Sequence, residues 1–178
     1  MTGDREHVTP RTLGFAVWSD DVTLVHELLD AGADPDDYGS EHSEGMTPLM
    51  ESVDEPEPFY GSERLLVTRL LLSAGARLEQ RDSTGRTALH YAVGAGRTAV
   101  DLLLEAGADA GTVAAGGITP LHEAVTRANL SAIEALCLHG ADRDARDEQG
   151  RTPAELLAED PDVFSPEELG KVTALLTS

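Results

Sequence analysis

Two short motifs recur along the chain, every 32 or 33 residues from Gly75 onward. The first is a threonine followed by proline or alanine and usually by leucine, and it occurs at four positions: Thr47, Thr87, Thr119 and Thr152. The second is a leucine-rich run that ends in glycine and alanine, and its glycine occurs at four positions: Gly32, Gly75, Gly107 and Gly140. Such a period predicts a stack of similar units, each of which buries its apolar face against its neighbours.

Both motifs have a local physical reason. Thr119 suits the N-cap of a helix because its hydroxyl accepts a hydrogen bond from a free amide of the first turn. Pro120 follows at the first helical position, where a missing N–H costs nothing. Gly107 comes after an apolar run, where helices commonly end in a left-handed residue. Because Gly94 and Gly96 interrupt the helical pattern between these signals, each unit is predicted to be helix, turn, helix and extended loop.

The period and the opening motif, Thr-Ala-Leu-His at 87–90 and Thr-Pro-Leu-His at 119–122, resemble those of ankyrin repeats. This resemblance implies an all-α, ankyrin-type helix-turn-helix solenoid with extended hairpin loops. About five repeats, including two terminal caps, would form a single domain over residues 1–178. Their approximate bounds are 9–42 (cap), 43–81 (with an insertion), 82–114, 115–147 and 148–178 (cap).

Two segments, both in the N-terminal half, are longer than the repeat requires. Thr47 and Gly75 are 28 residues apart, whereas Thr87 and Gly107 are 20 apart. The surplus is assigned to the stretch 54–61, in the turn between two helices. The loop before Thr47 is also long, at 15 residues against 12 in the next unit. Surface loops of a solenoid lengthen at little entropic cost, so these insertions are free to serve contacts.

Charge and cysteine content exclude several classes of function. The chain has 33 acidic and 13 basic residues, a formal net charge of −20, so its surface repels nucleic acids and anionic membranes. A single cysteine, Cys137, excludes an internal disulfide and a multi-cysteine zinc site. The charged N-terminal residues and the lack of an apolar run of ~18 residues predict a cytoplasmic location.

The residues that suggest catalysis or metal binding each have a structural interpretation. His90 and His122 follow capping threonines by three residues, and the ankyrin resemblance gives this histidine a role in the scaffold. Cys137 occupies a leucine position and is expected to be buried. Residues 94–97 resemble a phosphate loop only superficially, because the preceding strand and the required spacing are missing. We therefore expect no enzymatic activity, no cofactor and no metal.

The remaining expectation is recognition of another protein. Residues 1–60 contain 15 acidic and two basic residues, so the acidic excess is greatest there. Aromatic residues lie in both insertions, and aromatic residues surrounded by charge are frequent interface anchors. The ankyrin resemblance implies a further binding surface, which is the concave face formed by the hairpin tips and the first helices. Together these features predict ten partner-binding residues: Trp18, Tyr38, Glu44, Met46, Asp54, Glu55, Phe59, Tyr60, Arg86 and Arg127.

Two structural alternatives stay open. The acidic runs could be solvated loops, and Trp18 could cover the end of the capping repeat. The expected molecule is a monomer that binds a basic protein, and neither nucleic acid nor membrane, as an adaptor or regulator. The alternative function is that of an immunity protein or antitoxin-like inhibitor, which masks a basic, nucleic-acid-directed enzyme by imitating its anionic substrate.

Overall fold

The computed structural model describes residues 12–37, 45–54 and 61–177, and every regular element in these ranges is helical. The α-helices are α1 (Leu13–Trp18), α2 (Val22–Asp30), α3 (Pro48–Ser52), α4 (Ser62–Ser73), α5 (Ala88–Ala95), α6 (Arg97–Glu105), α7 (Pro120–Thr126), α8 (Leu130–Leu138), α9 (Pro153–Glu159) and α10 (Pro166–Thr177). Two short 3-10 turns are η1 (Ala115–Gly117) and η2 (Pro161–Val163). The predicted all-α class is confirmed.

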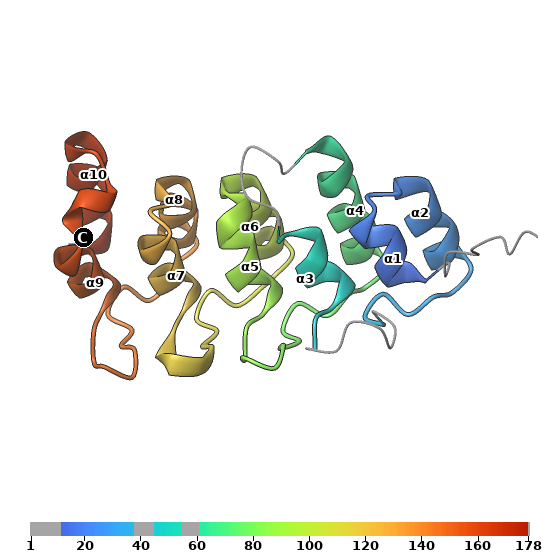
Figure 1. Cartoon of the computed structure of the whole chain (residues 1–178), viewed down its shortest axis with the longest axis horizontal. Coiled ribbons are helices and arrows are strands. Elements are labelled where there is room, and N and C mark those ends of the chain that lie inside the picture. Colours follow the sequence, from blue (N-terminus) through green and yellow to red (C-terminus); the bar gives the residue numbers. More distant parts are fainter. Residues whose placement is uncertain (1–11, 38–44, 55–60, 178) are drawn as a thin grey trace, which may run out of the picture.

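The α-helices form consecutive pairs that stand in a row (Figure 1). The first helix of each pair packs against the first helix of the next, which gives the row α1, α3, α5, α7 and α9. In the second row, α2 contacts α4, and α8 contacts both α6 and α10. The loops between successive pairs project from one side of the molecule (Figure 1). This arrangement is the helical solenoid that the repeat predicts.

Threonine starts the first helix of each pair. At the start of α3, the hydroxyl of Thr47 accepts a hydrogen bond from the amide of Met50 at 3.2 Å. Thr12 caps α1 in the same way, through the amide of Phe15 at 3.3 Å, although the rest of the opening motif is absent there. The first repeat therefore keeps the residue that satisfies the free amides of the helix start.

A left-handed glycine ends the second helix of the first four pairs, as the closing motif predicts. At the end of α6, Gly107 has φ +100°, and its amide donates to the carbonyl of Leu104 at 3.0 Å. The amide of Ala108 donates to the carbonyl of Leu103, also at 3.0 Å. These bonds satisfy carbonyls that the helix end would leave without a partner. Glycine adopts this φ without the strain that a Cβ would add.

The hydrophobic core runs through all the helix pairs. Leucines at the same place in successive opening motifs, Leu49, Leu89 and Leu121, are at most 1% exposed. Cys137 is also buried, as predicted, and its Sγ lies 3.9 Å from the carbonyl oxygen of Leu175 in α10. Each repeat thus buries its apolar face against the repeats beside it.

Ion pairs join the first two repeats. The Nε of Arg77 lies 2.7 Å from Oδ2 of Asp36, and the backbone amide of Arg77 donates to Oδ1 of the same carboxylate. The buried Arg64 of α4 places its Nε 2.8 Å from Oδ1 of Asp20, in the turn between α1 and α2. Asp36 belongs to the first acidic run, so this carboxylate holds a repeat junction and is not only solvated.

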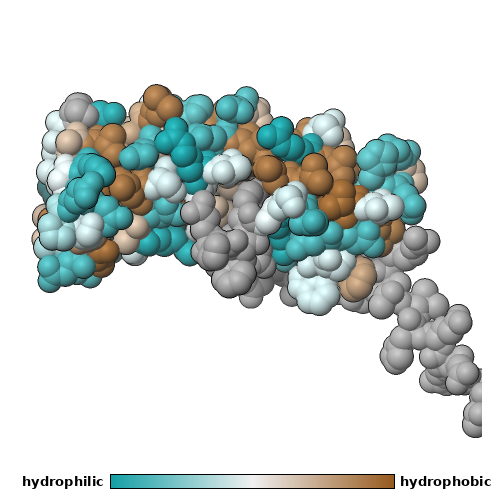
Figure 2. Space-filling view, turned by 90° about the horizontal axis from the view of Figure 1, so that it is seen from above, coloured by the Kyte–Doolittle hydropathy of each residue, from teal (hydrophilic) through white to brown (hydrophobic). Residues whose placement is uncertain are grey.

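The face opposite the hairpin loops mixes hydrophilic and hydrophobic side chains (Figure 2). Leu66 on α4 and Leu138 on α8 are among the exposed apolar residues. Single exposed apolar residues of this kind are ordinary on protein surfaces. Within the described ranges, no helix combines the length and apolar character that crossing a membrane requires.

Candidate protein-binding surface

An aspartate organises the hairpin tips of the third and fifth repeats. Oδ1 of Asp82 accepts hydrogen bonds from the amides of Thr84 and Arg86, at 2.8 and 2.9 Å. Asp147 accepts from two amides of its own tip in the same way. Burial alone would raise the pKa of either aspartate, but the hydrogen bonds to each carboxylate outweigh burial and lower its pKa. Both tips are therefore held by an ionised side chain.

Backbone hydrogen bonds link the tips to one another. The amide of Ala115 donates to the carbonyl of Thr84 at 2.9 Å, and the amide of Glu148 donates to the carbonyl of Gly116 at 2.8 Å. At Gly117 an added Cβ would lie 2.7 Å from the nitrogen of Glu148, so the close approach of these two tips requires glycine. The tips of the third to fifth repeats thus form one pre-ordered edge, which reduces the entropy lost on binding.

The two repeated histidines belong to the scaffold, as predicted. Nδ1 of His90 accepts from the amide of Thr87 at 3.2 Å, so its proton lies on Nε2, which donates to the carbonyl of Ile118 at 3.1 Å. Nε2 of His122 is 3.0 Å from the carbonyl of Arg151. Burial lowers the pKa of His90 and favours its neutral form. Among the described residues, no cluster of His, Cys, Asp or Glu could hold a metal ion.

A polar network crosses the first helices of the third and fourth repeats. Glu123 on α7 lies 2.8 Å from Nε of Arg127 and 3.3 Å from Nη2 of Arg86. The guanidinium of Arg86 lies 6.0 Å from the ring centre of Tyr91, whose hydroxyl donates to Asp82 at 2.6 Å. Burial and this hydrogen bond raise the pKa of Tyr91, which stays protonated. The network fixes two partly exposed arginines on the surface.

The structure describes five of the ten predicted partner-binding residues. The two arginines share one glutamate, as described above, while the other three lie in the first two repeats. Trp18 is 59% exposed at the end of α1, where its ring centre lies 5.9 Å from that of Phe15. Asp54 is exposed, and Met46 packs partly against the core. The other five lie outside the described residues: Tyr38, Glu44, Glu55, Phe59 and Tyr60.

The side chains that position the two arginines were not predicted from the sequence. Glu123 precedes Arg127 by four residues on one helix, a spacing that favours an ion pair and could have been recognised. Its contact with Arg86 joins residues 37 positions apart, and only the packing of α5 against α7 brings them together. Tyr91 carried no sequence signal for its contact with Asp82.

The comparisons with known proteins agree with this architecture. The family model for three copies of the ankyrin repeat matches residues 13–114, and the model for a single ankyrin repeat matches residues 116–148. A putative ankyrin repeat protein of fowlpox virus is 34% identical over 142 residues, which are 76% of this chain and 39% of the viral protein. Human ankyrin repeat domain-containing protein 63 is 35% identical over 132 residues, 74% of this chain and 31% of the human protein.

A putative ankyrin repeat protein of Rickettsia bellii is 34% identical over 93 residues, 51% of each chain. The chain thus spans about half or less of the length of these relatives. Because the family model covers more than half of the sequence, the chain belongs to the ankyrin repeat family. Ankyrin repeats mediate protein–protein interactions, and proteins built from them are generally non-catalytic interaction modules.

Proposed function

We propose that this solenoid binds a partner protein with a basic surface, which the acidic N-terminal part of the chain attracts. The observation that carries the proposal is the distribution of charge. The described residues before position 55 include nine acidic residues and no lysine or arginine. Two of these carboxylates, Asp20 and Asp36, pair with arginines of the second repeat. The negative charge that remains in excess attracts a cationic partner over a Debye length of ~8 Å at physiological ionic strength.

Two roles are compatible with such a partner. As an adaptor or regulator, the solenoid holds the partner and leaves its chemistry unchanged. As an inhibitor of the immunity-protein or antitoxin type, it covers a basic site that otherwise binds nucleic acid. Titration of the partner with this chain separates the two roles, because only the inhibitor abolishes nucleic-acid binding at equimolar ratio. In either role we propose a cytoplasmic monomer without catalytic activity.

Affinity capture from a lysate of the host, quantified by mass spectrometry, tests the proposal with three forms of the chain. The first is the wild type. The N-terminal variant carries three substitutions: E44Q, E55Q and E57Q. The control variant removes the same charge from exposed residues of the C-terminal half: E105Q, D144N and E148Q.

We expect the wild type and the control variant to capture the same basic protein. The N-terminal variant should not capture it. Loss of the captured protein at high salt should accompany this pattern, since screening weakens attraction between exposed charges. Equal recovery by all three forms, or a captured partner with an acidic surface, would overturn the proposal.

A further inference from the structure

The connection between the two helices is longest, among the fully described pairs, in the last repeat. In the fourth repeat, α7 ends at Thr126 and α8 begins at Leu130. In the fifth, α9 ends at Glu159 and α10 begins only at Pro166, with the turn η2 between them. Phe164 follows η2 and is 5% exposed, so it anchors the connection in the core. This anchor places η2 beside the ends of α7 and α9.

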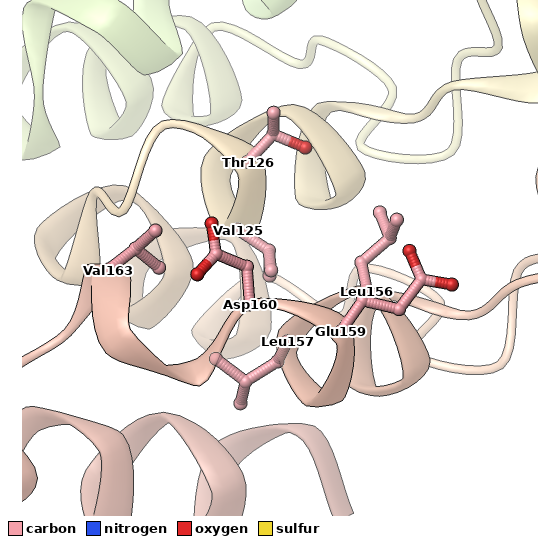
Figure 3. A pocket seen from close by; sticks show the side chains of 7 residues that line it. All are labelled: Val125, Thr126, Leu156, Leu157, Glu159, Asp160 and Val163. Carbon is pink, nitrogen blue, oxygen red and sulfur yellow. The ribbon is translucent and has the colours of Figure 1, made fainter.

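A pocket of about 160 Å³ lies between α7, α9 and η2, and we refer to it as the α7–α9 pocket (Figure 3). Its lining residues are Val125, Thr126, Leu156, Leu157, Glu159, Asp160 and Val163. Figure 3 shows Val163 and Asp160 on one side, Leu156 and Glu159 on the other, and Val125 between them. Val125 and Leu157 are almost fully buried, whereas Val163 is partly exposed at the edge. The pocket therefore has an apolar floor that a partner can reach.

The volume of the pocket suits one side chain. An apolar cavity of about 150 Å³ holds a molecule the size of benzene, whereas pockets for drug-sized ligands begin at about 300 Å³. A single aliphatic or aromatic side chain fits this range. Interfaces are commonly built in this way, with an apolar anchor in a pocket surrounded by a polar rim.

The charge around the pocket indicates which residues flank that side chain in the partner. Both charged residues of the lining, Glu159 and Asp160, are acidic. The neighbouring arginines are already engaged: Nε of Arg127 lies 2.8 Å from Glu123, and Arg151 lies within 3 Å of both Asp147 and Glu159. Glu159 is thus already paired with Arg151, and a cationic residue of the partner would meet the exposed carboxylate of Asp160 at the rim.

We propose that the α7–α9 pocket receives an apolar side chain of the partner protein, next to a lysine or arginine that faces Asp160. The proposal rests on the proposed function, because it assumes a protein partner with a basic surface. It adds a second contact, at the end of the solenoid far from the acidic N-terminal part (Figure 1).

Methyl NMR spectra of the full chain test this contact with defined probes at millimolar concentration, so that even weak binding is measured. The probe is the capped peptide acetyl-Arg-Leu-Arg-amide, and the comparison peptides are acetyl-Arg-Ala-Arg-amide and acetyl-Glu-Leu-Glu-amide. The methyl signals of Val125, Leu156, Leu157 and Val163 should shift saturably with the first peptide. Binding of the alanine peptide should be about tenfold weaker or more, since a pocket discriminates to this degree between side chains of different size. The acidic peptide should also bind more weakly.

Variants with matched controls locate the site. V163A shortens the wall of the pocket and D160N removes a rim charge, so each should weaken binding of the leucine peptide several-fold. The controls are L138A and E105Q, which change an exposed apolar and an exposed acidic residue on the second row of helices. They should leave the affinity unchanged. Circular dichroism and thermal unfolding establish that all four variants are folded.

The proposal is overturned if no pocket methyl shifts saturably, if the alanine or acidic peptide binds as well as the leucine peptide, or if the controls weaken binding as much as V163A and D160N. These results are independent of the affinity capture. If capture still depends on the N-terminal acids while the pocket fails, only the present inference falls. If the pocket binds the peptide while capture ignores the N-terminal acids, only the proposed function falls.

Discussion

In the first, third and fourth repeats, the turn between the two helices of the pair places one residue at positive φ. Gly96 does so in the third repeat with φ +84°, whereas Asp20 and Ala128 adopt φ +55° and +53° in the first and fourth. Glycine adopts these values freely, while a residue with a Cβ loses roughly 1–2 kcal/mol there. The first and fourth repeats therefore hold a residue with a Cβ at a positive φ, where the third repeat has glycine.

Ala128→Gly should raise the free energy of unfolding by about 0.5–1 kcal/mol, because the release of backbone strain exceeds the loss of one half-buried methyl group. Ala106→Gly is the matched control. Ala106 caps α6 at φ −74°, where glycine brings no relief, so this change should lower stability by about 0.5–1 kcal/mol. Urea denaturation measures both. A loss of stability in Ala128→Gly would contradict the strained turn.

The buried His90 should make stability depend on pH. Its folded-state pKa is lowered below 6.5, so the unfolded chain takes up the proton first as the pH falls. Its contribution is complete above pH 6.5 and decreases below that value, by at most about 1.4 kcal/mol per pH unit, until the folded state is protonated as well.

Urea denaturation at about pH 7.5 and about pH 5.5 checks this effect, since histidine titrates between them. H90Q should be less stable than the wild type at the higher pH and should lose less stability on acidification. H26Q changes an exposed histidine and should retain the wild-type decrease. If H90Q and the wild type lose equal stability between the two pH values, another group is responsible.

The ends of helices depend on backbone conformation. Two glycines test this dependence without a change in packing, because both have space for a side chain and only one is at positive φ. A Cβ added at Gly107 or at Gly170 would meet no atom within 4 Å. Gly107 has φ +100° at the end of α6, whereas Gly170 lies inside α10. Gly107→Ala should therefore lower the free energy of unfolding by about 1 kcal/mol or more. Gly170→Ala should raise it by up to about 1 kcal/mol. Equal effects in denaturant titrations would show that the closing glycine is not required.

Helix starts and ends were predictable because their signals are local. Thr119 with Pro120 and Gly107 satisfy backbone groups within one turn of themselves, so the sequence alone shows their role. The long connection in the last repeat was not recognised, and both insertions were placed in the N-terminal half. Pro161 and Pro166 flank that connection, but proline shows only where a helix cannot continue and not where the chain goes next.

At the scale of the whole molecule, the sequence predicted the solenoid fold but few of the side-chain contacts on its surface. The period fixes which faces are buried, because every repeat must pack against the next. The contacts of Arg86 with Glu123 and of Arg77 with Asp36 depend on the offset between repeats, which the period does not supply. For the same reason the sequence did not show that Asp36 holds a junction, whereas the ankyrin resemblance had pointed to Arg86 and Arg127 as expected surface residues.

The central claim is that acidic charge in the N-terminal part attracts a basic partner to this solenoid. Stopped-flow measurement of association with the captured partner, as a function of ionic strength, tests it most directly. The Debye length shrinks from ~30 Å at 0.01 M salt to ~3 Å at 1 M, so the association rate constant should fall by about tenfold or more across this range. The dissociation rate constant should change little, and the variant with E44Q, E55Q and E57Q should show a weaker salt dependence. Association that is equally fast at low and high salt, and identical in that variant, would contradict the claim.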